Sequence, residues 1–262
     1  MTQKMLIDAD IIVYQAAASS ERIVEFNDDL HVLYSDTKEA KVILDERLSQ
    51  FEEDTGIATD DMVFCFSDRK NFRKDILPTY KGNRKSSRKP IAYVPLKEFV
   101  EETYNSVTMP GLEGDDVIGI LATNPVDNND YIIWSIDKDL MQIPGKHWVM
   151  DEVSEVNEEE AHRFHMLQTL MGDSVDGYSG CPGIGVKRAE AILDISTDWQ
   201  IVEDTYLAKG LTEKEALVQA RVARICRHED YDFDKQEAIP WLPKLENLTT
   251  TTSDASTGSK TQ

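Results

Sequence analysis

The chain has 262 residues, of which 40% are hydrophobic, and a formal net charge of −21 at pH 7. This length is enough to bury a substantial core in one large or two small domains. No apolar run approaches the roughly 20 residues that a membrane span needs, and the first apolar run is interrupted by Asp8 and Asp10, so we expect neither an anchor nor a signal peptide. Three cysteines without a CxxC spacing argue against zinc and for a reducing compartment. We therefore expect a soluble cytoplasmic protein that makes no use of a membrane.

Short apolar runs predict strands at residues 4–8, 62–67, 106–109 and 131–136. Helical stretches alternate with them. The clearest covers residues 36–54, which begin with the capping-box pattern Asp36-x-x-Glu39 and stop at Gly56. Residues 31–34 are expected to add an edge strand. The alternation predicts an α/β fold with a parallel sheet.

Three of these apolar runs end on an aspartate, namely Asp8, Asp68 and Asp137. In an open parallel sheet the carboxyl ends of the strands face one crevice, so acids placed there by separate strands converge. Converging carboxylates repel one another and raise one another's pKa unless a divalent cation holds them together. The pattern therefore predicts a metal site.

Further acids lie near a helix start, after the last predicted strand and beyond a later helix: Glu113, Asp115, Asp116, Asp139, Asp173 and Asp176. Together with the strand-end aspartates they make nine carboxylates with no accompanying His or Cys. Such a set suits Mg²⁺ or Mn²⁺ better than zinc. Each acid alone could be only a helix cap, but caps have no reason to recur at the ends of strands.

A basic strip runs through residues 69–89, which contain nine Lys or Arg against Asp75 alone. A strip of this density, starting one residue after Asp68, is attractive to a phosphate backbone, and Tyr80 within it offers a ring on which a base could stack. The acidic remainder of the chain would guide DNA toward it. A solvated loop is the alternative. The basic residues expected to contact DNA are Lys81, Arg84, Lys85, Arg88 and Lys89.

A second phosphate-binding feature follows a helical stretch that begins with the capping pattern Asn157-x-x-Glu160. It is the run GCPGIGVKRA, in which Gly183 and Gly185 let backbone N–H groups approach a phosphate at a helix start, while Lys187 and Arg188 add charge. We interpret it as the hairpin of a helix-hairpin-helix element, which binds backbone without reading bases. A merely structural tight turn is the alternative.

The motifs LIDAD, FSDRKNFRKDILPTYKGNR, LEGDD, SIDKDL, GDSVDG and GCPGIGVKRA together resemble the 5′-nuclease family, which includes phage 5′-3′ exonucleases, the 5′-nuclease domain of bacterial DNA polymerase I and flap endonucleases. The resemblance implies a parallel-sheet, PIN-like nuclease domain over residues 1–156 with a basic helical arch near residues 70–92. It also implies a helical helix-hairpin-helix (H3TH) domain over residues 157–244, with its hairpin near residues 180–189. Residues 245–262, half of them Ser or Thr, are expected to be disordered.

The same resemblance implies two metal positions. One is formed by Asp8, Asp68, Glu113 and Asp115 with Asp116 close by, and the other by Asp137, Asp139, Asp173 and Asp176. Lys81 and Arg84 match a basic pair that faces the scissile phosphate, and Tyr80 matches a base-stacking aromatic. Asp10 matches no family ligand.

The implied reaction uses two Mg²⁺ (or Mn²⁺), one lowering the pKa of a bound water and the other stabilising the leaving 3′ oxygen, while Lys81 and Arg84 neutralise charge on the phosphate. Asp8, Asp68 and Asp115 complete the expected catalytic set. The substrate is DNA with a free 5′ end (duplex, nicked or flap), with an RNA–DNA hybrid as a further candidate. The family also suggests K⁺ at the hairpin, and a phage protein of this type would act in the host cytoplasm.

Two other functions match part of the sequence. Asp8-Ala-Asp10 with the later acids Asp173 and Asp176 is similar to haloacid-dehalogenase-like phosphatases, which use an aspartyl nucleophile. That reading leaves the basic strip and the hairpin unexplained. A non-catalytic DNA-binding module that uses the hairpin alone would have no use for nine clustered acids.

Overall fold

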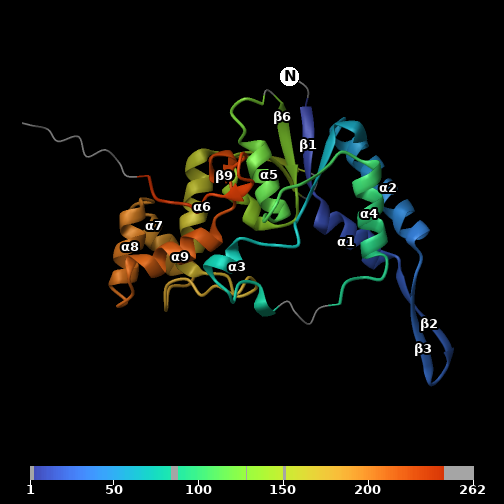
Figure 1. The fold of residues 1–262 in the computed structure, drawn as a ribbon, viewed down its shortest axis with the longest axis horizontal. Helices are drawn as coiled ribbons and strands as arrows, with labels where there is room; N and C mark the ends of the chain where they lie inside the picture. Colours follow the sequence, from blue (N-terminus) through green and yellow to red (C-terminus); the bar gives the residue numbers. More distant parts are fainter. Residues whose placement is uncertain (1–2, 84–87, 128, 150–151, 245–262) are drawn as a thin grey trace, which may run out of the picture.

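The computed structural model describes residues 3–83, 88–127, 129–149 and 152–244; the predicted disordered tail, residues 245–262, lies outside them. A central sheet is flanked by helices on both faces, a group of helices lies to one side, and a two-stranded ribbon projects at the opposite end (Figure 1). No helix in the described part of the chain is long and apolar enough to cross a membrane.

The central sheet has six strands in the order β5-β4-β1-β6-β7-β8. These strands are β1 (Gln3–Asp8), β4 (Met62–Phe66), β5 (Ser106–Thr108), β6 (Asp130–Trp134), β7 (Gly145–Val149) and β8 (Glu152–Val156). All pairings are parallel except that of β7 with β8. The four predicted strands are confirmed. The apolar runs of β1, β4 and β6 are largely buried on both faces, as a covered parallel sheet requires, whereas the edge strand β5 is only half-buried. The antiparallel edge strand β8 was not predicted, since most of its side chains are exposed.

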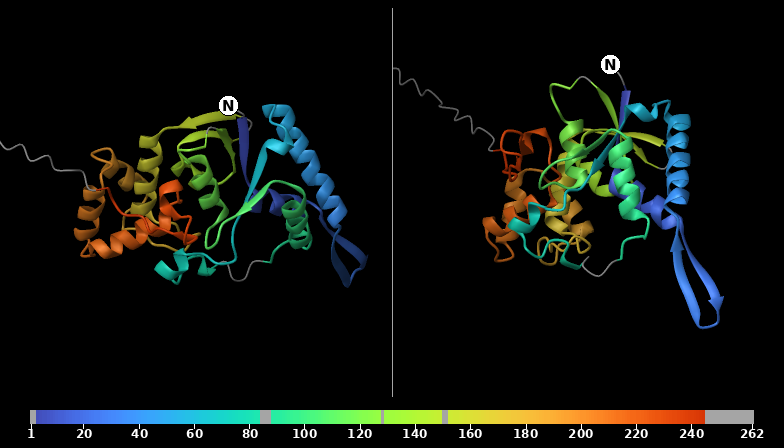
Figure 2. Two further views of the ribbon diagram at one scale, coloured as in Figure 1. Left: turned by 45° about the horizontal axis from the view of Figure 1, so that its top comes forward. Right: turned by 45° about the vertical axis from the view of Figure 1, so that its right-hand side comes forward.

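Each face of the sheet has its own apolar core. On one face lie α1 (Ala9–Ser19), α2 (Thr37–Thr55) and α4 (Tyr93–Thr103), and on the other lies α5 (Gly114–Ala122) (Figure 2). The predicted helix at residues 36–54 is confirmed: the Asp36 side chain accepts a hydrogen bond from the Lys38 N–H, and Gly56 ends the helix with a left-handed φ of 71°.

The helical group contains α6 (Glu158–Met171), α7 (Val186–Leu193), α8 (Trp199–Leu207) and α9 (Glu213–Ala223). These helices enclose a third core, and α6 begins with the expected capping box of Asn157 and Glu160. After α9 the chain returns to the sheet, where Ile225 and Cys226 pack against α5. The remaining short elements are η1 (Thr59–Asp61), α3 (Arg73–Ile76), η3 (Lys138–Gln142), η4 (His228–Asp230), β9 (Tyr231–Asp232) and β10 (Glu237–Ala238).

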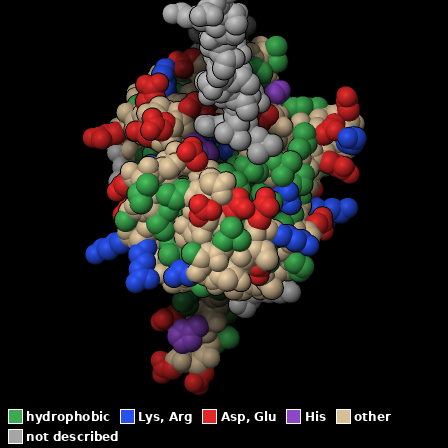
Figure 3. All heavy atoms as spheres, turned by 90° about the vertical axis from the view of Figure 1, so that its left-hand side faces the viewer, with side chains coloured by type: hydrophobic (Ala, Val, Ile, Leu, Met, Phe, Trp, Pro, Cys, Tyr) green, Lys and Arg blue, Asp and Glu red, His purple; other side chains and the backbone are tan. Residues whose placement is uncertain are grey.

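The expected edge strand at residues 31–34 does form, but not in the central sheet. It belongs to β3 (Leu30–Ser35), which pairs with β2 (Glu21–Asn27) in a separate antiparallel ribbon. The ribbon projects beyond the body of the molecule (Figures 1 and 3). The expectation that it joins the sheet was wrong because β5 and β8 occupy both edges of the central sheet. The apolar side chains of the ribbon, such as Val32 and Tyr34, each 42% exposed, stay outside the core.

Candidate metal centre

A cavity of about 860 Å³ opens at the carboxyl ends of the central strands, where a parallel sheet places the side chains that follow its strands. Seven of the nine predicted acids line it: Asp8, Asp68, Glu113, Asp115, Asp137, Asp139 and Asp176. Asp116 and Asp173 are not part of its wall. The convergence comes from β1, β4 and β6, which are far apart in the sequence and adjacent in the sheet, and from the start of α5 beside them.

Asp8 lies at the centre of this wall, at the end of β1 and at the N-cap of α1. Its carboxylate accepts hydrogen bonds from the Ile11 N–H at 3.2 Å and from Ser135 Oγ at 3.0 Å. Ser135 Oγ in turn accepts from the Asp137 N–H at 3.0 Å, so the ends of β1 and β6 are joined at this point. Burial, together with the nearby charges of Asp10 and Asp137, raises the pKa of Asp8 to about 7.

The acids beside Asp8 show the same effect. Burial and the charges of Asp8 and Asp137 raise the pKa of Asp115 well above its usual range. Burial and neighbouring carboxylates raise the pKa of Asp139 to about 6, although Gln168 Nε2 donates to it at 2.7 Å. Ionising these neighbouring acids together therefore has an energetic cost, which a bound cation would remove.

Asp68 behaves differently because backbone N–H groups, one of them from the loop between β5 and α5, donate to it. Its carboxylate accepts from the Gly111 N–H at 2.8 Å and from the Arg69 N–H at 2.6 Å. The hydrogen bond from Gly111, more than any other contact, lowers the pKa of Asp68. This acid is therefore ionised and fixed in orientation at the rim of the cavity.

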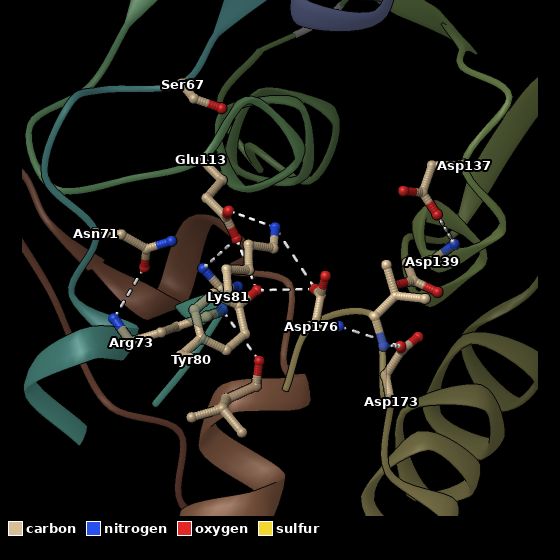
Figure 4. A network of polar contacts seen from close by, with 12 residues as sticks. Ser67, Asn71, Arg73, Tyr80, Lys81, Glu113, Asp137, Asp139, Asp173 and Asp176 are labelled. Carbon is tan, nitrogen blue, oxygen red and sulfur yellow. Dashed lines mark hydrogen bonds and ion pairs between the residues drawn. The ribbon is translucent and has the colours of Figure 1, made fainter. Parts of the chain in front are cut away.

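Glu113 and Asp176 share a cationic partner (Figure 4). Lys81 Nζ lies 2.5 Å from Glu113 Oε1 and 3.5 Å from Asp176 Oδ2. The Tyr80 hydroxyl lies within hydrogen-bond distance of both acids, 2.9 Å from Glu113 and 3.0 Å from Asp176, and its single hydrogen is shared between them. The expectation that Tyr80 stacks on a base is not met in this arrangement, because its ring is 3% exposed and packs with Tyr178.

Asp116 is a structural anion here and not a member of the cavity wall. It is fully buried, and its two oxygens accept from the two terminal nitrogens of Arg73, each at 2.7 Å. The Cys226 N–H donates to it at 2.9 Å. With its oxygens directed at these donors, Asp116 is turned away from the position that the sequence predicted for it.

Asp173 shapes the loop that carries Asp176. Its Oδ1 accepts from the Val175 N–H at 2.7 Å and from the Asp176 N–H at 3.3 Å. Figure 4 shows Asp173 below Asp139 and Asp137, on the side of the cavity away from Glu113. Asp173 therefore holds the loop in which Asp176 lies close to Lys81 and Tyr80.

The donor set fits a hard divalent cation in its chemistry. The cavity wall carries only carboxylates as strong ligands, and three of them have pKa values raised by burial and mutual repulsion. Among the residues described, no three His, Cys, Asp or Glu side chains lie close enough to enclose one ion. In this arrangement Lys81 pairs with Glu113 and Asp176, and Arg73 also pairs with Glu113 at 3.4 Å, so loading a metal requires these side chains to rearrange.

Mg²⁺ is expected to stabilise the protein more at pH 8 than at pH 5.5. Because the folded-state pKa values of Asp8 and Asp139 lie above their unfolded values, the metal-free fold gains stability as the pH falls through 7 and 6, and loses it as the pH rises. A cation removes this penalty only where the acids are ionised. Melting curves with Mg²⁺ and with EDTA should show a rise in Tm larger by about 5 °C at pH 8. An equal rise at both pH values would contradict the assignment.

Asp10, which matches no ligand of the 5′-nuclease family, also lines the cavity. It accepts from the Ser67 N–H at 2.8 Å and from the Tyr93 hydroxyl at 2.7 Å. It therefore joins the start of α1 to the end of β4 and to α4. Its position two residues after Asp8 was the sequence signal that could have placed it at the cavity.

The basic strip is only partly described. Arg84 and Lys85, two of its predicted DNA contacts, lie outside the described residues. Arg88 forms a bidentate ion pair with Glu21 of β2, with both distances 2.7 Å, and Lys89 Nζ lies 4.0 Å from the centre of the Tyr93 ring. Lys89 and Lys81 line the acidic cavity, so the strip borders the proposed metal centre as predicted from its position in the sequence.

The predicted hairpin forms a tight turn before α7. Gly183 has a left-handed φ of 74°, and its carbonyl accepts from the Arg188 side chain at 2.7 Å. Gly185 caps α7 in an extended conformation with no side-chain hydrogen bond, and Lys187 is exposed beside it. The face formed by the helical group carries its Lys and Arg side chains mainly toward its margins (Figure 3). The first backbone N–H groups of α7 are thus presented next to basic side chains.

A parallel α/β sheet whose strand ends bear a cavity of carboxylates bordered by a basic segment, followed along the chain by a group of helices with a hairpin, defines a nuclease of the PIN-like class. Residues 3–168 match the family model described as 5′-3′ exonuclease, N-terminal resolvase-like domain, and the chain belongs to this family. The resemblance seen in the motifs is confirmed, and the phosphatase and non-catalytic readings are set aside.

Relatives cover nearly the whole chain. It is 29% identical over 280 residues to the exodeoxyribonuclease of Enterobacteria phage T3, covering 92% of this chain and 93% of that protein. It is also 29% identical over 280 residues to the exonuclease of Escherichia phage T7, covering 91% of this chain and 93% of that protein. Among solved structures, the T5 D15 protein co-crystallised with metal ions aligns with a TM-score of 0.64 at 16% identity, over 83% of this chain and 87% of that one. This structural likeness shows that the fold is shared.

Proposed function

We propose that the protein is a metal-dependent 5′-3′ exonuclease and structure-specific 5′ flap endonuclease that hydrolyses DNA phosphodiesters during replication, recombination or repair. The observation that carries the proposal is the set of seven carboxylates on one cavity wall at the strand ends, bordered by Lys81 and Lys89. The phage relatives named exodeoxyribonuclease and exonuclease support DNA as the substrate. A D15 flap endonuclease solved with DNA and metal ions, with a TM-score of 0.58, has the same fold.

The cofactors proposed are two Mg²⁺ or Mn²⁺ ions, and the acids would hold them in two sets. Around Glu113 the candidates are Asp8, Asp68 and Asp115, and around Asp137 they are Asp139, Asp173 and Asp176. Bound there, such cations would activate water as the nucleophile and stabilise the charge on the leaving 3′ oxygen. Ser135 and the Gly111 N–H hold Asp8 and Asp68 in fixed orientations, which keeps the ligand oxygens at the end of the sheet.

The basic residues act on the substrate backbone. Lys81 and Arg84 would neutralise charge on the scissile phosphate, and Lys85, Arg88 and Lys89 would guide the strand past it. At the hairpin, the N–H groups near Gly183 and Gly185, with Lys187 and Arg188, would bind duplex phosphates. K⁺ at the hairpin belongs to this proposal as an accessory ion.

The experiment that tests the proposal compares covalently closed, nicked and linear plasmid DNA in Mg²⁺ and in EDTA. Nicked and linear forms should be shortened from the 5′ side in Mg²⁺, and the closed form should resist because it offers no 5′ end. All forms should survive in EDTA. A flap and an RNA–DNA hybrid in parallel reactions establish the preferred 5′ structure. Rapid loss of the closed form, or cleavage in EDTA, would contradict the proposal.

The two basic clusters are expected to contribute differently. Lys81→Ala should lower the single-turnover cleavage rate by about 100-fold or more with little change in affinity, because a charge facing the scissile phosphate acts on the transition state. Lys187→Ala should mainly weaken binding and reduce its salt dependence. Lys235→Ala removes an exposed charge from a turn where it pairs with Asp232, and serves as the control. If Lys81→Ala and Lys187→Ala change the cleavage rate and the affinity equally, the two clusters do not have these separate roles.

A further inference from the structure

We propose that Lys81 is an internal counter-ion that occupies the metal-ligand carboxylates Glu113 and Asp176 in the metal-free protein and is displaced from them when a divalent cation binds. The inference rests on the proposed function in one respect, namely that these acids take a cation. It goes beyond that function by assigning Lys81 a role in metal loading, so that the same side chain competes with the metal and then becomes available to the substrate.

The contacts of the Lys81 ammonium carry the proposal. Its Nζ lies 2.5 Å from Glu113 Oε1 and 3.5 Å from Asp176 Oδ2, between an acid that precedes α5 and an acid of the loop after α6. The side chains of these three residues are only 13–17% exposed. A cation that bridges two carboxylates in a cavity lined by acids takes the place that a metal ion would take, and it satisfies the same oxygens.

The ammonium and a metal ion exclude one another at these oxygens. A divalent cation that uses Glu113 Oε1 must approach the oxygen that already accepts from Lys81, and two cations sharing one oxygen repel strongly where water is scarce. The doubly charged ion attracts the carboxylates more strongly than the ammonium does, which favours displacement of Lys81. At Glu113 the Tyr80 hydroxyl does not compete with the metal for Oε1, since it lies 2.9 Å from the other oxygen, Oε2. At Asp176 it lies 3.0 Å from Oδ2, the oxygen that Lys81 also contacts.

The backbone of Lys81 is arranged so that its side chain can move alone. Lys81 has a φ of 51°, a left-handed conformation that is uncommon for a residue with a side chain. Its N–H donates to the Asp176 carbonyl at 2.7 Å, and the neighbouring Asn83 side chain donates to the carbonyls of Ser174 and Val175. These bonds attach the segment to the 173–178 loop independently of the ammonium. A displaced Lys81 therefore stays at the cavity, where a substrate phosphate would be the next anion available to it.

The first test measures Mn²⁺ binding by electron paramagnetic resonance, without DNA, for the wild type, Lys81→Met and Lys97→Met. Lys97 is the matched control, because its ammonium lines the same cavity but lies over the Phe66 ring at 4.3 Å and pairs with Glu101. Lys81→Met should lower the Kd for Mn²⁺ about tenfold or more, and Lys97→Met should change it by no more than about twofold. The Tm of Lys81→Met should fall in EDTA and return to that of the wild type in saturating Mn²⁺.

A second measurement uses the wild type, so it does not depend on the folding of a variant. Acylation of lysines followed by mass spectrometry should show Lys81 protected in EDTA and labelled faster in saturating Mg²⁺, with Lys97 unchanged. If the wild type binds Mn²⁺ and Lys81→Met binds it no more tightly, this inference alone is overturned. The same holds if the labelling rate of Lys81 is equal in EDTA and in Mg²⁺. An absence of Mn²⁺ binding in every variant would contradict both the inference and the proposed metal centre.

Discussion

Asp68→Ala and Asp137→Ala are each expected to reduce DNA cleavage by at least about 1,000-fold, because a metal ion supplies several kcal/mol of transition-state stabilisation and each tenfold in rate corresponds to about 1.4 kcal/mol. Both acids follow strands at the edge of the same cavity, one after β4 and one after β6. Neither touches the hairpin before α7. DNA binding, measured by fluorescence anisotropy in Ca²⁺, should therefore survive in both variants.

The control for these variants is Asp194→Ala, which removes an exposed carboxylate that pairs with Arg163 in the helical group. It should leave the single-turnover rate unchanged. Full activity of Asp68→Ala or of Asp137→Ala would remove that residue from the ligand set. Loss of DNA binding together with loss of cleavage would instead indicate that the substitution had disturbed the fold.

Asp116→Ala is expected to lower the free energy of unfolding by about 3–5 kcal/mol, since removing one partner of a buried ion pair leaves the other charge uncompensated. Arg73 would lose both of its 2.7 Å contacts with Asp116 and keep only the longer 3.4 Å ion pair with Glu113. Its remaining hydrogen bonds go to the carbonyls of Val222 and Arg224. These contacts join the start of the basic strip to α5 and to the end of α9. Urea unfolding followed by circular dichroism in EDTA measures the effect.

The same Asp194→Ala variant calibrates this measurement, because breaking its exposed ion pair should change stability by less than about 1 kcal/mol. The double variant Arg73→Met/Asp116→Leu should recover much of the loss, since apolar side chains can replace a buried pair. Unchanged stability of Asp116→Ala combined with weaker Mn²⁺ binding would show that Asp116 is a metal ligand, as the sequence predicted.

The central strands could be predicted because a parallel sheet covered on both faces demands continuous apolar runs, and β1, β4 and β6 consist of such runs. Residues 31–34 of β3 could be predicted as a strand but not placed, and its partner β2 was not predicted. Placement depends on which edges of the sheet remain open, and both edges here are taken by β5 and β8. Strand β8, with four of its five side chains exposed, carries little periodic signal.

The acids on the cavity wall could be predicted because the rule that strand ends share one crevice depends only on topology. The exceptions depend on partners that are distant in the sequence. Asp116 pairs with a residue 43 positions away, and the hydroxyl of Tyr80 bonds to an acid 96 positions away. Helix position alone suggested that Asp116 faces the metal, and an aromatic ring in a basic strip suggested an exposed Tyr80. Both side chains are buried instead, and the sequence does not show burial for single polar residues.

The most direct measurement of the central claim, that this acid-lined cavity hydrolyses DNA from a 5′ end with a divalent cation, is digestion of one linear duplex labelled at either end. In Mg²⁺, a 5′-labelled strand should release short labelled fragments at once, while the same strand labelled at its 3′ end should shorten gradually and keep its label. Neither should change in EDTA. Early loss of the 3′ label as short fragments, or cleavage that proceeds in EDTA, would contradict the account.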